Sequence, residues 1–238
     1  MGAIAAALQA CQKRIDSACH AAGRAKNCAH LIAVSKTFPV AALREAYAAG
    51  QRVFGESYLQ EALPKLEQLA DLAIEWHFIG PLQSNKTRQV ATHFDWVHSV
   101  AREKDAQRLS EQRPPGLPPL QVCLQVNVSG EVSKHGVELD AALALAQVIA
   151  ALPNLQLRGF MAIPEPGLSL PAQRNRFRQV AALLDAAQTA GLPLDTLSMG
   201  MSDDLEAAIM ERASMVRVGT AIFGARQKIE INQLEQAS

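Results

Sequence analysis

A lysine stands where a buried strand is expected to end, in the stretch "LIAVSKTFPV" at residues 31–40. Burial at such a position favours the neutral amine of Lys36, a nucleophile that forms a Schiff base with a carbonyl compound. In the alternative interpretation, the side chain only carries its ammonium group from the strand end to solvent. The position alone supports the two interpretations equally.

A second stretch, "SMGMSDDLEAAI" (198–209), offers groups that bind an anion. Gly200 permits close approach of the backbone to a ligand. Met201 and Ser202 supply an amide and a hydroxyl at the predicted start of a helix, where amides point outward. The alternative is a plain serine cap whose two following aspartates complement the helix dipole.

A third stretch, "VRVGTAIFGAR" (216–226), places Gly219 and Thr220 directly after a predicted strand. In (β/α)₈ barrels, a phosphate group commonly binds between the loops after strands seven and eight. Here those two loops carry "GMS" and "GT". The pair of loops favours a phosphate site more than either loop does alone.

The elements that must position these residues alternate along the chain. Short β-branched or apolar runs are separated by longer stretches rich in alanine and leucine with helical spacing. Helices are predicted at 39–50, at 58–70 with a kink or restart at Pro64, and from Ser84 as N-cap. The predicted strands are 31–36, 52–56, 75–80, 96–100, 120–128, 155–163, 196–200 and 215–224.

Eight such units in 238 residues favour a single α/β domain, a (β/α)₈ TIM-type barrel. A doubly wound open sheet is the competitor, but no GxGxxG follows any predicted strand. The domain is expected to span residues 1–238, with a polar tail from about 228 to 238. In a barrel, functional residues lie at the carboxyl ends of the strands.

Arg217 alternates with Val216 and Val218, so its side chain is expected to point into the barrel. A buried arginine needs a partner, and the simplest candidate is a barrel carboxylate such as Glu56. A Schiff-base lysine, a phosphate cup and an inward arginine together suggest pyridoxal 5′-phosphate. The lysine would hold the aldehyde carbon, and the arginine would donate to the pyridine nitrogen.

With these features, the chain resembles the pyridoxal-phosphate homeostasis proteins, whose barrel is similar to the N-terminal domain of alanine racemases. The resemblance covers nearly the whole chain and implies a single barrel of the type III pyridoxal-phosphate fold. The motifs that carry it are "AVSKTFP" (33–39), "FGESYLQE" (54–61), "WHFIGPLQSNK" (76–86), "LSMGMSDDLEAAI" (197–209) and "RVGTAIFGAR" (217–226).

By matching position, the resemblance implies that Lys36 carries the internal aldimine. It also implies that Ser202, Gly219 and Thr220, with the Met201 amide, hold the phosphate group.

The resemblance further implies that Arg217 faces the pyridine nitrogen and that His77 and Met161 lie near the ring. Ser57 departs from the pattern, because the family usually has asparagine there, close to the cofactor. Serine is shorter and lacks the amide donor, so a water molecule could replace that donor or the affinity could differ.

The same barrel serves racemases, so the activity must be argued from the site. Racemisation needs an acid/base group on each face of the substrate. In alanine racemases, the resemblance implies, the second base is a tyrosine from a second domain of another subunit. We expect no such domain after strand eight, and Tyr47 and Tyr58 are the only tyrosines.

The favoured hypothesis is a cytoplasmic pyridoxal-phosphate carrier or regulator without robust catalysis, which delivers the cofactor to apo-enzymes. The second is a small pyridoxal-phosphate-dependent racemase or lyase. The third is a Schiff-base aldolase that uses Lys36 without the cofactor. An absorption spectrum, turnover of amino acids and transfer to apo-acceptors separate the three.

Composition bounds the partners. The 23 basic and 23 acidic residues give no net charge, so neither nucleic acid nor an acidic membrane is expected to bind. No stretch is apolar enough for a membrane span, and the histidines and cysteines lack metal-site spacing.

A monomer or weak homodimer is expected. Lys134 in "SGEVSKHGV" (129–137) could form a second cofactor site, and "RNRFRQ" (174–179) could contact a protein, although solvated surfaces are the simpler interpretation of both.

Overall fold

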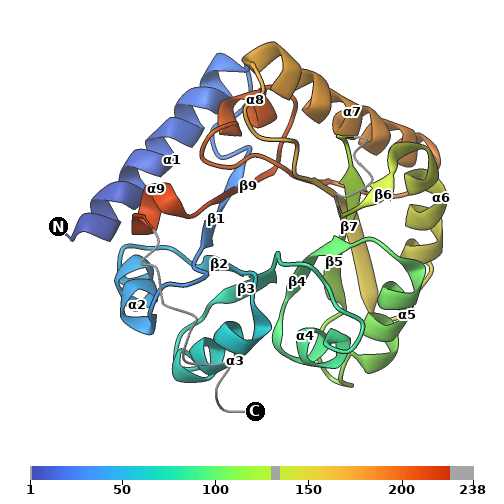
Figure 1. Ribbon diagram of the computed structural model, residues 1–238, viewed down its shortest axis with the longest axis horizontal. Helices are drawn as coiled ribbons and strands as arrows, with labels where there is room; N and C mark the ends of the chain where they lie inside the picture. Colours follow the sequence, from blue (N-terminus) through green and yellow to red (C-terminus); the bar gives the residue numbers. More distant parts are fainter. Residues whose placement is uncertain (1, 130–134, 226–238) are drawn as a thin grey trace.

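The alternating apolar runs form parallel strands that pair with their neighbours into a closed barrel (Figure 1). The computed structural model describes residues 2–129 and 135–225. The strands of the barrel are β1 (His30–Val34), β2 (Val53–Glu56), β3 (Glu75–Phe78), β4 (Trp96–Val100), β5 (Leu120–Asn127), β7 (Leu155–Ala162), β8 (Thr196–Ser198) and β9 (Met215–Val218).

The strand order is β4-β3-β2-β1-β9-β8-β7-β5, and pairing of β4 with β5 closes the ring. A short strand, β6 (Val137–Glu138), adds to β5 beside the barrel. The predicted (β/α)₈ barrel is therefore confirmed. All eight strands begin within one residue of the expected start, and all but the last end within two residues of the expected end.

Helices form an outer ring around the barrel (Figure 1). One of them, α1, precedes the first strand and lies beside α8 and α9. Of the helices in the described ranges, none has the length and apolarity needed to cross a bilayer. The helices are α1 (Ala3–Ala21), α2 (Val40–Ala48), α3 (Leu59–Gln68), α4 (Thr87–His93), α5 (Glu103–Gln112), α6 (Leu139–Ala150), α7 (Leu170–Thr189), α8 (Leu205–Met210) and α9 (Thr220–Phe223).

The prediction of a strand over 215–224 was wrong in its second half. Strand β9 ends at Val218, where its pairing with β1 also ends. From Gly219 onward the amides turn to local partners, since those of Ile222 and Phe223 both donate to the Gly219 carbonyl. A short apolar run is compatible with either a strand or a helix. Hydrophobicity alone could therefore not locate the point where β9 ends and the helical turn begins.

Two helix predictions also differ from the structure. Ser84 does not cap α4, which begins at Thr87, because the Ser84 hydroxyl donates to Asp105 instead, at 2.7 Å. Helix α3 continues through Pro64 and does not restart there. The helical bond that this proline cannot make would go to the carbonyl of Gln60, within the first turn of α3.

The alternation of side chains along the strands divides the barrel into two environments. On β3, Trp76 and Phe78 face outward into the apolar core beneath the helices. The alternate residue, His77, faces inward and stacks on Trp96. Polar and charged side chains are thus concentrated inside the barrel, where they need hydrogen-bond partners.

Candidate functional site

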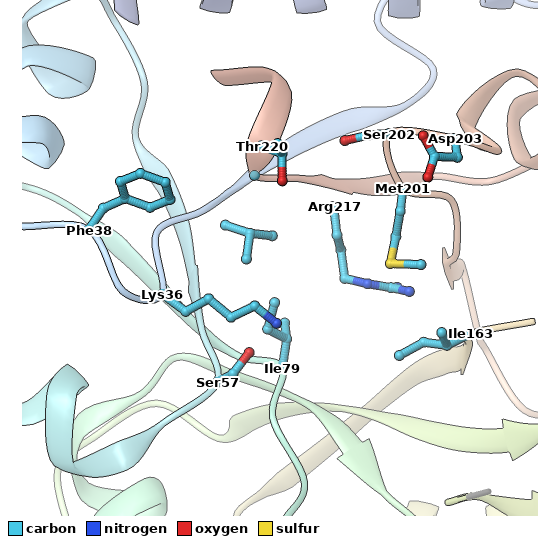
Figure 2. Close-up of a pocket in the computed structure, with 12 residues that line it drawn as sticks. Lys36, Phe38, Ser57, Ile79, Ile163, Met201, Ser202, Asp203, Arg217 and Thr220 are labelled. Carbon is cyan, nitrogen blue, oxygen red and sulfur yellow. The ribbon is translucent and has the colours of Figure 1, made fainter. Parts of the chain in front are cut away.

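A cavity of about 290 Å³ opens at the carboxyl ends of the strands (Figure 2). Five lining residues were not predicted: Val34, Phe38, Ile79, Ile163 and Asp203. Two predicted site residues, His77 and Met161, do not line it. The predicted residues that do line it are Lys36, Ser57, Met201, Ser202, Arg217, Gly219 and Thr220.

Lys36 follows β1 and extends into the cavity (Figure 2). The residue before it, Ser35, is fully buried and anchors the strand end. The Ser35 hydroxyl donates to Oε1 of Glu56 at 2.7 Å. Nζ of Lys65 donates to the same oxygen at 2.9 Å and to the Ser35 carbonyl at 3.0 Å. The backbone that carries Lys36 is therefore held by a buried ion pair.

The residue after Lys36 is strained. Thr37 has φ of 68°, a conformation that β-branched residues rarely adopt. Its amide donates to Oε2 of Glu61 at 3.0 Å, which helps to hold the turn. Local strain of this kind costs on the order of 1–3 kcal/mol and is concentrated at functional sites. The turn therefore supports a functional role for the lysine before it.

Ser202 and Thr220 lie along one edge of the cavity, across from Lys36 (Figure 2). Gly219 packs so closely on β1 that a Cβ atom there would lie 3.0 Å from the Val34 carbonyl oxygen. A bulkier residue would therefore push against β1 at Val34. The hydroxyls and the glycine form a small polar cup, which is suited to an oxyanion.

The helix after this cup begins later than predicted. Its N-cap is Asp204, two residues after Ser202, so Ser202 is not the cap. Oδ1 of Asp204 accepts a hydrogen bond of 2.6 Å from the Met201 amide. Burial raises the pKa of Asp204. The amide predicted to bind phosphate is thus engaged by a carboxylate of the same loop.

Arg217 points inward and is buried, as the alternation along β9 predicts. The expected pairing of Arg217 with Glu56 was wrong, because Glu56 forms its ion pair with Lys65. The Arg217 guanidinium donates instead to the carbonyl of Ser198 at 2.6 Å, to its hydroxyl at 2.7 Å and to the carbonyl of Ala162 at 3.0 Å. Burial lowers the pKa of Arg217 to about 10, which leaves it cationic near neutral pH.

His77 and Met161 lie one layer below the cavity. Met161 packs against Trp96 inside the barrel. Residues two positions further along the same strands point the same way, and those residues, Ile79 and Ile163, line the cavity. Counting two residues on from each predicted inward position shows that both isoleucines point inward as well, but not that they lie at the depth of the cavity.

Other sequence motifs lie away from the cavity. The basic segment 174–179 forms ion pairs, in which Arg174 and Arg178 contact Glu211 and Arg176 contacts Glu165. Those arginines are therefore part of a paired surface. Lys134 and the tail from residue 228 lie outside the described residues.

Gly80 follows β3 and supports Ser57 at the cavity wall. A Cβ atom on Gly80 would lie 2.0 Å from the Ser57 carbonyl oxygen, and backbone cannot give way as a flexible side chain can. We expect Gly80→Ala to destabilise the protein by about 2 kcal/mol through this overpacking, measured by denaturant unfolding. Gly2→Ala is the control, because a Cβ atom there would meet only the end of the flexible Glu45 side chain, which can move aside. Equal losses in the two variants would contradict the prediction.

The fold and the cavity agree with one class of protein. The family model for the alanine racemase N-terminal domain matches residues 7–227. A solved alanine racemase from Corynebacterium glutamicum superposes with a TM-score of 0.69 over 94% of this chain and 61% of its own. It is only 18% identical, so this likeness concerns the fold.

More similar relatives narrow the class. A pyridoxal phosphate homeostasis protein of Pseudomonas aeruginosa is 61% identical over 226 residues, which cover 95% of this chain and 97% of the relative. Its counterpart in Escherichia coli strain K12 is 49% identical over 95% of this chain and 98% of its own. The structure of PipY from Synechococcus elongatus with PLP bound is 38% identical, with a TM-score of 0.82 over 93% of this chain and 100% of that one. The chain belongs to the pyridoxal phosphate homeostasis protein family.

Proposed function

We propose that this chain binds pyridoxal 5′-phosphate through a Schiff base with Lys36 and acts in its homeostasis in the cytoplasm, without robust catalysis. The observation that carries the proposal is one cavity shared by the Lys36 amine, the Arg217 guanidinium and the Ser202 and Thr220 hydroxyls. These groups match an aldehyde, a ring nitrogen and a phosphate. The names of the relatives and the PLP-bound PipY structure support the same ligand.

The residues that line the cavity bind different parts of the ligand. The Lys36 amine condenses with the aldehyde and releases one water. Ser202 and Thr220 donate hydrogen bonds to phosphate oxygens. The side chain of Asp203 also faces the cavity, and its negative charge opposes that of the phosphate. This opposing charge should lower the affinity of the cup for phosphate, which is compatible with a protein that must release its ligand.

Arg217 bears on the choice between carrier and enzyme. Bound pyridoxal phosphate serves catalysis as an electron sink, which works best with a protonated ring nitrogen. A cationic arginine only donates hydrogen bonds, so it would keep that nitrogen unprotonated. This pairing disfavours carbanion chemistry and supports the carrier.

The alternative is a small racemase or lyase, which would need a second acid/base group at the cavity. Within the described ranges, no tyrosine lines it. Tyr58 caps α3 with its side chain exposed, and Tyr47 lies on α2 beneath the guanidinium of Arg52, 3.8 Å from its ring centre. Both positions favour the carrier over the enzyme.

The test combines a spectrum with two assays. Adding pyridoxal phosphate to the purified protein is expected to produce a Schiff-base absorption band. The loaded protein is expected to activate an apo-enzyme that depends on the cofactor, and to turn over no amino acid at ordinary enzyme rates. A missing band would overturn the binding proposal and leave the aldolase alternative. Steady turnover would favour the racemase or lyase. Sedimentation would test the expected monomer or weak homodimer.

The two hydroxyls of the cup give a sharper prediction. We expect Ser202→Ala and Thr220→Val each to weaken binding of pyridoxal phosphate about ten- to a hundredfold, which corresponds to the loss of one hydrogen bond to a charged group. Pyridoxal, which lacks the phosphate, serves as the matched ligand, and its binding should not change. Equilibrium titration by absorbance measures both ligands. Equal weakening for the two would place the hydroxyls elsewhere than at the phosphate.

A further inference from the structure

A line of polar side chains, buried except for Glu75 at its far end, crosses the barrel interior beneath the cavity. Oε1 of Glu75 lies 2.7 Å from Nε2 of His77, and Nδ1 of His77 lies 2.7 Å from Nε2 of His98. Nδ1 of His98 lies 2.7 Å from Oγ of Ser198, the oxygen that also accepts a hydrogen bond from Arg217. Because Glu75 begins β3, the line runs from the cavity to the opposite end of the barrel.

The Glu75 end gives the line a direction. An ionised Glu75 can only accept hydrogen bonds, and Arg217 at the other end can only donate them. Ser198 accepts from Arg217 and gives its own proton to Nδ1 of His98. His98 then carries its proton on Nε2 and donates it to Nδ1 of His77. His77 in turn carries its proton on Nε2 and donates it to Glu75.

The reverse direction fails at one contact. It would leave Nε2 of His77 without a proton, 2.7 Å from a carboxylate oxygen, so that two acceptors would face each other. A doubly protonated His77 would avoid the conflict, but burial lowers the pKa of His77 and lowers that of His98 further. Glu75 and Asp95 oppose the lowering at His77, whereas Arg217 adds to it at His98. Other charged or titratable groups that act on the line are His30, Cys123, Arg158 and Asp204.

We propose that Ser198, His98 and His77 are positioning residues for Arg217, joined in a hydrogen-bond chain of fixed direction in which both histidines are neutral and protonated on Nε2. Three of the five N–H groups of Arg217 are held by Ser198 and Ala162. The hydrogen-bond chain holds the Ser198 hydroxyl toward Nδ1 of His98, with its oxygen placed to accept from Arg217. The guanidinium therefore keeps one orientation and presents its other donors to the cavity. This inference rests on the proposed function in one respect only, namely that the ring faced by Arg217 is that of pyridoxal phosphate.

The direction of the chain is tested on the ligand-free protein. Nitrogen-15 NMR of labelled histidine distinguishes the two neutral tautomers and the cation, and the exposed His20 and His93 give reference signals. We expect His77 and His98 to be protonated on Nε2 alone and unchanged between about pH 6 and pH 8. A proton on Nδ1 of either histidine, or titration of either in that range, would overturn the assignment.

Variants at the two ends test whether the chain itself selects the tautomers. The Glu75 end sets the direction, because the Ser198 hydroxyl has two acceptor lone pairs and could accept from both Arg217 and His98. Ser198→Ala should therefore leave both histidines protonated on Nε2, whereas Glu75→Ala should give a mixture of tautomers. A change in Ser198→Ala, or none in Glu75→Ala, would refute the chain as their cause. Circular dichroism and a melting curve check that each variant is folded.

A cofactor titration tests the effect on Arg217. Ser198→Ala removes one acceptor of Arg217 and should weaken binding of pyridoxal phosphate about three- to tenfold and shift the absorption band of the bound form. Ser99→Ala is the matched control, because the buried Ser99 hydroxyl has no partner among the described residues. An unchanged affinity and band in Ser198→Ala would refute the positioning role. If the wild type bound no pyridoxal phosphate, the proposed function would fail, while the tautomer assignment would stand or fall on the NMR result.

Discussion

Replacing Lys36 by alanine is expected to abolish the Schiff-base band that pyridoxal phosphate produces with the wild-type protein. The amine is the group that condenses with the aldehyde, and it extends into the cavity (Figure 2). The remaining contacts at Ser202, Thr220 and Arg217 should retain the ligand without a covalent bond, with affinity reduced about a hundredfold or more, since each tenfold corresponds to about 1.4 kcal/mol. Absorbance titration and mass spectrometry after borohydride reduction measure the two effects.

Two further variants separate the amine from its charge and its location. Lys36→Arg keeps the positive charge but has no amine that condenses with an aldehyde at neutral pH. It should therefore lose the band as Lys36→Ala does. Lys86→Ala changes a half-buried lysine that does not line the cavity, and it should keep the band. A reduced adduct on any lysine other than Lys36 at one equivalent of ligand would contradict the assignment.

The second large effect concerns stability and the ion pair behind Lys36. We expect Lys65→Met to destabilise the protein by about 3–5 kcal/mol, because it leaves the buried carboxylate of Glu56 without its cation. Oε2 of Glu56 already has no partner among the described residues, so the carboxylate has little else to rely on. Denaturant unfolding measures the loss. Lys104→Met, at an exposed position, should change stability by less than about 0.5 kcal/mol.

The pH dependence of this loss has a definite sign. Burial raises the pKa of Glu56 in the folded protein, and Lys65 opposes that rise. Without Lys65 the folded-state pKa lies further above the unfolded value, so the folded state binds a proton more readily and loses stability as pH rises through that pKa. The deficit of Lys65→Met should therefore be smaller at about pH 5 than at about pH 8. Adding Glu56→Gln should recover part of the loss, and a deficit independent of both pH and Glu56 would contradict the mechanism.

Much of the fold could be predicted from the sequence because its main signals are local. Eight apolar runs separated by helical spacing specify a parallel barrel, and the barrel brings the carboxyl ends of its strands together. Lys36 and Gly219 are remote in sequence, yet β1 and β9 are neighbours in the closed ring. Topology alone was enough to place both residues at one cavity.

Depth inside the barrel and the choice of partners could not be predicted in the same way. Period-two alternation says that His77 faces inward, but it does not say that Ile79, two residues later, reaches the cavity. Arg217 had several possible partners. In the structure, backbone carbonyls of β7 and β8 accept its hydrogen bonds, and Glu56 does not. These outcomes depend on contacts between segments far apart in the chain, which no local pattern encodes.

The hydrogen bond between the Asp204 carboxylate and the Met201 amide bears on how tightly an anionic ligand binds. If phosphate binds at this amide, it does so by exchange, because a tethered anion already occupies the donor. When the phosphate departs, the carboxylate can return at once, and no amide remains unsatisfied in the empty protein. Such an internal substitute lowers the free energy of the empty state and so weakens the net binding of a ligand at this amide. Weaker binding of this kind is compatible with the proposed role, in which the protein must give its ligand up.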